Sequence, residues 1–292
     1  MFLYAGGKAA EHTATTVRGH LAYAMVMFRD LQNLVRGFGQ RLLPAPAIAP
    51  LEDGEWAALR ASVPFIDQLP PPERQALRER IGEFLGRKTF KGIRMRLDPW
   101  QRHVIAAYAC LPILRLGIDA YRDWQTVIVY PDTFAPEQEW VDEAGVHHQA
   151  VVPQAGEAWE RGPVVLSWSD IANDGAVIVH EVMHTLDAGN GDVNGFPPLP
   201  RNLSATEWTD TFSAAYDQLL DEVDRGDEPV IDPYAATDPA EFLAVVTEYF
   251  FFSPAYLQAE WPAIYRLLAL YFDLEPHGWT DEIPTNIPWA SD

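Results

Sequence analysis

The chain has 292 residues, 48% of them hydrophobic and 12% aromatic, which is enough apolar material for a large core in one or two domains. Its formal net charge of −21 would repel a nucleic-acid backbone over most of the surface, so we expect no nucleic-acid partner. The single cysteine excludes a disulfide scaffold within the chain and fits a cytoplasmic location.

The first fifty residues differ in pattern from the rest of the chain. Their longest apolar run, residues 21–28, is too short to cross a bilayer, so we expect no membrane span. A cluster of prolines that ends at Pro50 then indicates a linker. We therefore predict an N-terminal arm with a proline-rich linker over residues 1–50, followed by one main domain over residues 51–292.

From residue 51 onward the sequence predicts mainly helices, with short strands between them. Asp98 and Pro99 are a typical helix start, and the apolar residues that follow place this helix in the core. The expected elements, in chain order, are helices 55–62 and 71–85, strand 89–97, helix 99–116, strands 125–130, 146–152 and 163–168, and helices 177–187, 204–223, 240–252 and 262–272. This mixture predicts an α+β fold, mostly helical, with a small mixed sheet beside helix 177–187.

The helix over residues 177–187 contains the motif H-E-x-x-H, formed by His180, Glu181 and His184. Residues four apart lie on one helix face, so both imidazoles would point at one metal ion, and Glu181 could take a proton from the attacking water. The motif arises by chance in roughly one chain in a hundred. The alternative is a core helix with hydrogen-bonded histidines, but an apolar helix rarely buries three such groups without a partner.

A zinc site of this kind needs a third protein ligand. One class of enzymes uses a histidine six residues after the motif, but Asn190 occupies that position here and Asp187 replaces the expected glycine. The other class uses a glutamate on a later helix, where Glu241 and Glu248 lie seven residues apart on one face. Glu241 could instead cap the helix that Asp238 begins, and Glu248 could be a buried paired acid. The spacing leaves this choice open.

Four stretches of the sequence have a recognisable pattern: His180–Asp187 with Asn190–Asp192 and Pro197–Pro200, Asp232–Phe242, Thr247–Phe251, and Gly156–Trp168. Together they resemble the Mlc titration factor family of zinc peptidases, over roughly residues 51–275, and Gly156–Trp168 is similar to the strand before that family's metal helix. The resemblance implies a zincin-like metallopeptidase fold of the gluzincin type, with an active site similar to that of the anthrax lethal factor catalytic domain.

This resemblance assigns the residues of the site. It implies that Glu241 is the third ligand and that Tyr234 is the catalytic tyrosine. The predicted centre is then one Zn²⁺ per chain bound by His180, His184 and Glu241, with the Tyr234 phenol stabilising the substrate oxyanion. The alternative for Tyr234 is a loop tyrosine with a structural hydrogen bond only.

Two further acids are expected to support the metal ligands. Asp187 follows His184 by about one turn and could accept the second imidazole N–H; alternatively it could cap the helix end, where an acid opposes the helix dipole. Glu248 is expected to hydrogen-bond within the site rather than bind the metal.

The predicted function is a zinc-dependent peptidase that acts on peptide substrates. Strand 163–168 is expected at a sheet edge, where the main chain of Val164, Val165 and Leu166 could pair with an extended peptide. The resemblance implies aminopeptidase-type activity and binding of a sugar-responsive transcriptional repressor. The alternative is a non-catalytic protein that titrates this repressor and whose zinc site is idle or regulatory.

Overall fold

The computed structural model of the chain describes residues 51–132, 138–141, 147–150 and 162–279. The predicted arm and linker, residues 1–50, lie outside the described residues, as do residues 156–161 of the resembling stretch and the tail from residue 280. The division of the chain near residue 50 therefore stays a prediction.

The described part is mostly helical with few strands, which confirms the α+β prediction. The α-helices are α3 (Asp53–Ser62), α4 (Pro71–Arg87), α5 (Pro99–Cys110), α6 (Trp168–Asn173), α7 (Ala176–Asp187), α8 (Ala205–Arg225), α9 (Pro239–Phe252), α10 (Pro254–Glu260) and α11 (Pro262–Phe272). Short 3-10 helices are η1 (Pro64–Gln68), η2 (Ile118–Tyr121), η3 (Ala188–Asn190), η4 (Pro233–Ala236) and η5 (Pro276–Gly278).

Side-chain caps explain where the main helices begin. Asp98 accepts a hydrogen bond from the Gln101 amide at 2.8 Å, and Asp238 accepts from the Glu241 amide at 3.0 Å. The predicted starts of α5 and α9 are therefore confirmed. The predicted end of the first of these helices, near residue 116, is wrong. Helix α5 ends at Cys110, because Pro112 lacks the amide hydrogen that would continue the helical hydrogen-bond pattern.

The main sheet has the order β1 (Thr89–Gly92), β2 (Thr126–Tyr130) and β5 (Val164–Ser167). All three strands are parallel, so the prediction of a mixed sheet is wrong. The residue pattern of a strand does not show its direction relative to its neighbours. Helix α5 connects β1 to β2 and brings the chain back to the same end of the sheet, so the two strands are parallel. The strand predicted at 89–97 ends at Gly92, and Arg94 has a left-handed φ of 60°.

Strands β3 (Gln138–Val141) and β4 (His147–Ala150) form a separate antiparallel pair. Among the described residues, no helix is long and apolar enough to cross a bilayer.

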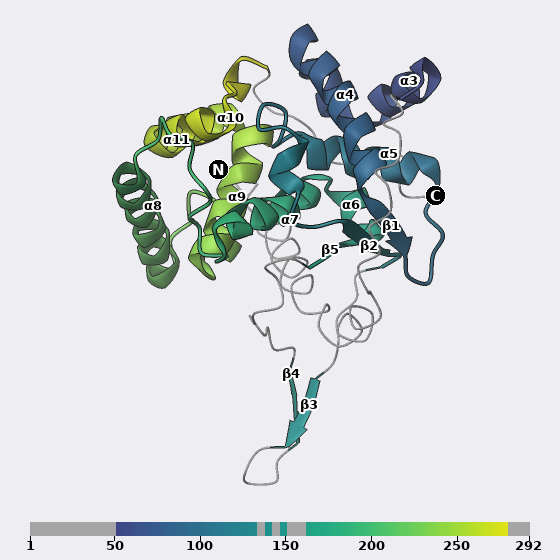
Figure 1. Ribbon diagram of the computed structural model, residues 1–292. Helices are drawn as coiled ribbons and strands as arrows, with labels where there is room; N and C mark the ends of the chain where they lie inside the picture. The colour runs from purple at the N-terminus through teal and green to yellow at the C-terminus, as the bar shows by residue number, and fades with distance from the viewer. Residues whose placement is uncertain (1–50, 133–137, 142–146, 151–161, 280–292) are drawn as a thin grey trace, which may run out of the picture.

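Helix α7 lies in the middle of the molecule. Figure 1 shows α8, α9, α10 and α11 on one side of it and α4, α5 and the main sheet on the other. Helix α7 packs against α9, α5 and strand β5. Its apolar residues Val177, Ile178 and Val182 are at most 3% exposed, as the sequence predicted for a buried helix. This packing fixes the two faces of α7 and directs its polar residues toward α9.

Candidate metal centre

Helix α7 holds the two histidines of the motif side by side. The ring centroids of His180 and His184 are 4.9 Å apart, and His180 is only 3% exposed. One turn of helix separates the two residues, so their imidazoles lie on the face that meets α9.

Glu241, in the first turn of α9, meets both imidazoles. Its Oε2 lies 2.8 Å from His180 Nε2, and its Oε1 lies 3.5 Å from His184 Nε2. One ligand atom from each of the three residues lies within 4.8 Å of the others. Zinc bonds to imidazole nitrogen and carboxylate oxygen are about 2.0–2.2 Å long, so one ion fits among donor atoms at these separations. Two imidazoles and one carboxylate also match the donor set of catalytic zinc sites, which leave a position open.

Glu248 contacts the other nitrogen of the first histidine. Its Oε1 lies 2.6 Å from His180 Nδ1, so the two acids of α9 contact different nitrogens of one imidazole. The structure thus brings Glu241 together with both histidines and places Glu248 behind His180. In this arrangement Glu248 accepts a hydrogen bond from Nδ1–H and leaves Nε2 for a metal.

Burial and the neighbouring charges shift the pKa values of the site residues in opposite directions. Burial lowers the pKa of His180, but the hydrogen bonds to Glu241 and Glu248 outweigh it and raise the pKa well above 6.5. Burial similarly works against a charged His184, yet the Glu241 carboxylate raises the pKa of His184. Burial would raise the pKa of Glu241, whereas both imidazoles together hold this pKa well below its ordinary value. The two imidazoles and the Glu241 carboxylate therefore each favour the charged form of the other.

Glu181 and Tyr234 lie next to this group. Glu181 is half-buried on α7, and Tyr234, in η4, is 6% exposed with its ring centroid 6.1 Å from that of His180. Burial, followed by the negative charges of Glu241 and Glu181, raises the pKa of the Tyr234 phenol. The phenol thus keeps its proton at neutral pH and can donate a hydrogen bond.

Asp187 contacts a loop of the chain. Its Oδ2 accepts a hydrogen bond from the Gly195 amide at 2.7 Å, and in the described part of the chain no hydrogen bond joins it to His184. The predicted contact with the imidazole is therefore replaced by a contact with the loop after α7. Burial raises the pKa of Asp187 to about 6, and the amides of residues 194–196 partly counter this effect.

Gly195 is a site residue that the sequence reasoning missed. Its φ is +80°, and a Cβ there would lie 2.5 Å from the carbonyl oxygen of Pro239, two residues before Glu241. The loop that Asp187 anchors therefore packs against the start of α9. The Asn194-Gly195 dipeptide is a turn signal that could have marked this position.

Strand β5 is an edge strand of the main sheet in the described part of the chain. Val164, Val165 and Leu166 are at most 5% exposed, so their side chains belong to the core. Only the main chain of this strand could engage a peptide.

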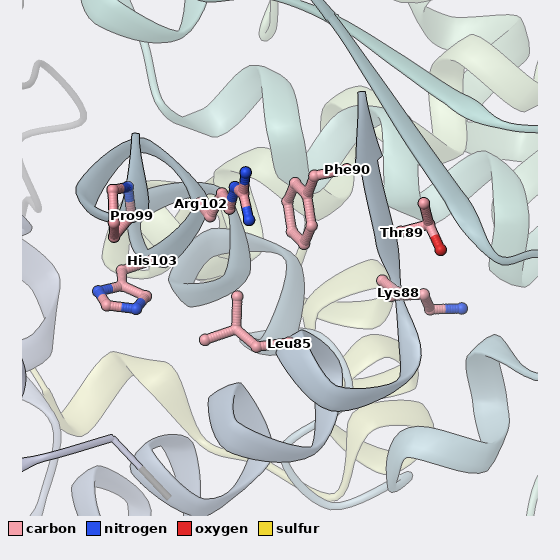
Figure 2. A pocket seen from close by; sticks show the side chains of 7 residues that line it. All are labelled: Leu85, Lys88, Thr89, Phe90, Pro99, Arg102 and His103. Atoms are coloured by element: carbon pink, nitrogen blue, oxygen red, sulfur yellow. The ribbon is translucent and has the colours of Figure 1, made fainter. Parts of the chain in front are cut away.

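A cavity of about 460 Å³ lies elsewhere and shares no residue with this centre. Figure 2 shows it between α4, β1 and the start of α5, and its lining residues are Leu85, Lys88, Thr89, Phe90, Pro99, Arg102 and His103.

Comparison with known proteins identifies similar chains. Residues 43–273 match the family model described as glucose-regulated metallo-peptidase M90. Mlc titration factor A of Klebsiella pneumoniae is 37% identical over 224 residues, which are 74% of this chain and 84% of that protein. An uncharacterized protein of Synechocystis is 40% identical over 236 residues, 78% of this chain and 86% of that protein. Mlc titration factor A of Salmonella gallinarum is 36% identical over 241 residues, 80% of this chain and 90% of that protein.

Proposed function

Because the chain belongs to the M90 family of glucose-regulated metallo-peptidases, we propose that it is a zinc-dependent peptidase of the aminopeptidase type with a zincin-like fold. The observation that carries the proposal is the meeting of His180, His184 and Glu241, whose donor atoms suit one zinc ion. Glu181 and Tyr234 lie next to these ligands and support the proposal, because they could supply a base and a hydrogen-bond donor.

In this proposal each residue has a separate task. His180, His184 and Glu241 would hold the zinc, which when bound would act as a Lewis acid toward the peptide carbonyl and lower the pKa of water. Glu181 takes the proton of the attacking water and passes it to the leaving amine. The Tyr234 phenol, which stays protonated, donates a hydrogen bond to the oxyanion.

The substrate would lie along strand β5. The place of β5 (Val164–Ser167) beside α7, which carries His180 and His184, supports a role for its main chain in holding an extended peptide, because peptides add to sheets by main-chain hydrogen bonds. The side chains of Val164, Val165 and Leu166 would support this strand from the core.

A Glu181→Gln variant tests the chemistry. The substitution removes the base but deletes no metal ligand, so zinc content should equal that of wild type while turnover falls at least about 100-fold. Glu260→Gln, at the exposed end of α10, is the matched control and should leave both unchanged. Amino-acid anilides and N-blocked short peptides serve as the two substrates, and aminopeptidase action requires cleavage of the first only. Unchanged turnover in Glu181→Gln would refute the peptidase proposal.

A second function rests on the names of the relatives. Several are called Mlc titration factor A, which indicates that those proteins titrate Mlc. We extend this to binding of a sugar-responsive transcriptional repressor in the cytoplasm by the present chain. The alternative is that this binding is the sole function and the zinc site is idle or regulatory. Pull-down of purified Mlc by the Glu181→Gln protein separates the two, because binding would persist after loss of hydrolysis.

A further inference from the structure

Side chains of the loop that carries Tyr234 form hydrogen bonds with the main chain of this residue. The Tyr234 amide donates to Asp232 Oδ1 at 2.9 Å, and the Tyr234 carbonyl accepts from the Thr237 hydroxyl at 2.7 Å. These short-range bonds shape η4, but they do not fix its position relative to α7 and α9. That position needs contacts from outside the loop.

Two tyrosines from separate helices supply such contacts. The Tyr256 hydroxyl, on α10, donates to the Val230 carbonyl at 2.7 Å. The Tyr216 hydroxyl, on α8, donates to the Ala236 carbonyl at 3.1 Å. The two carbonyls lie four residues before and two residues after Tyr234, so the hydroxyls hold the loop on both sides of it.

We propose that Tyr216 and Tyr256 are positioning residues that fix the Tyr234 phenol relative to His180 and Glu241. The consequence for catalysis rests on the proposed peptidase function. A reacting group must be held closely, and a misplacement of about 1 Å can cost about 100-fold in rate. Two hydroxyls that hydrogen-bond to the loop before and after Tyr234 resist such a displacement.

The rings of the two tyrosines have packing partners of their own. The Tyr216 ring lies 5.5 Å from that of Phe242, and the Tyr256 ring lies 5.9 Å from that of Tyr249. Substitution by phenylalanine therefore removes each hydroxyl and leaves the ring contact in place. The substitutions thus test the hydrogen bonds rather than the packing.

The first experiment compares Tyr216→Phe, Tyr256→Phe and the double variant with Tyr121→Phe. Tyr121 is the matched control because its buried hydroxyl also donates to a carbonyl, that of Ala109, at 2.9 Å but far along the chain from the loop. We expect kcat of the double variant to fall roughly tenfold, with KM within about twofold and zinc content unchanged. Tyr121→Phe should lower the melting temperature and leave kcat unchanged. A double variant with wild-type kcat would overturn the proposal.

A second comparison asks whether the effect passes through Tyr234. In a Tyr234→Phe protein, further removal of the hydroxyls of Tyr216 and Tyr256 should not lower kcat again, because the group they position is already absent. An equal loss of kcat in both backgrounds would assign the effect to general destabilisation and overturn the proposal.

A third measurement does not depend on activity. Hydrogen exchange of the amides of residues 230–237 should be faster in the double variant than in wild type and unchanged in Tyr121→Phe. Unchanged exchange in the double variant would overturn the positioning role. Absence of hydrolysis in the wild type would refute the proposed function instead, and the exchange result would still decide this inference.

Discussion

The Glu248 carboxylate lies 2.6 Å from His180 Nδ1, while Glu241 contacts Nε2 of the same imidazole at 2.8 Å. With a metal bound, Glu248 would therefore select the tautomer whose Nε2 lone pair faces the ion. Two acids of similar type on one helix face thus have different tasks.

Substitution of each acid should separate these tasks. Glu241→Ala removes a donor of the metal group, so we expect zinc to be lost on dialysis. Glu248→Ala leaves all three donors and should weaken zinc affinity by about 10–100-fold. Metal analysis and competition with a chromogenic chelator give the two affinities. Retention of zinc by Glu241→Ala together with its loss from Glu248→Ala would reverse our assignment.

Zinc uptake should release protons. The pKa of His180 in the metal-free site is well above 6.5, because Glu241 and Glu248 outweigh the effect of burial, so at pH 7 the imidazole holds a proton that the metal must displace. Zinc affinity should therefore increase as pH rises through 7 toward the raised pKa of His180. Calorimetric titration in two buffers with different ionisation enthalpies measures the number of protons released. Identical apparent enthalpies in both buffers would contradict the prediction.

Gly195→Ala should affect the metal site from a distance. A Cβ at this residue would lie 2.5 Å from the Pro239 carbonyl oxygen and displace the start of α9, which carries Glu241. We expect lower stability and weaker zinc binding. Gly226→Ala is the control, since Gly226 also has a positive φ of +71° but no atom within 4 Å of an added Cβ. The free energy of unfolding of the control should fall only by the cost of a left-handed conformation for alanine, about 1–2 kcal/mol, and its zinc affinity should equal that of wild type. Equal zinc affinities in the two variants would argue against a link through Pro239.

Lys88 should make stability depend on pH. Its Nζ donates to the Tyr121 carbonyl at 2.6 Å and lies 3.6 Å from the Trp124 ring centroid, and Figure 2 shows it directed away from Arg102 and His103. Burial lowers the pKa of Lys88 from 10.5 to about 7. Between these values the unfolded chain binds the proton and the folded chain releases it, so the free energy of unfolding should rise with pH.

Comparison with Lys88→Met isolates this contribution, because the variant lacks the titrating amine. Urea unfolding of both proteins at pH 6 and pH 9 is the measurement. Wild type should gain stability relative to the variant at the higher pH. A constant difference between the two proteins would contradict a lowered pKa for Lys88.

The sequence by itself determined the local features of the site. The motif of His180, Glu181 and His184 predicted a buried helix with two imidazoles on one face, because helical periodicity alone places residues four apart together. The caps at Asp98 and Asp238 likewise predicted where α5 and α9 begin, because a capping bond joins residues close in the chain.

Only the tertiary structure decided which distant groups meet. Glu241 and Glu248 share one face of α9, so their spacing did not show which of them meets both imidazoles; the packing of α9 on α7 brings Glu241 to both. The parallel direction of β1 and β2 and the contacts of Asp187 with Gly195 and of Tyr216 with the Tyr234 loop have the same origin. These contacts join segments that are distant in the sequence. Their relative position follows from how the helices pack, and a local pattern of residues does not predict it.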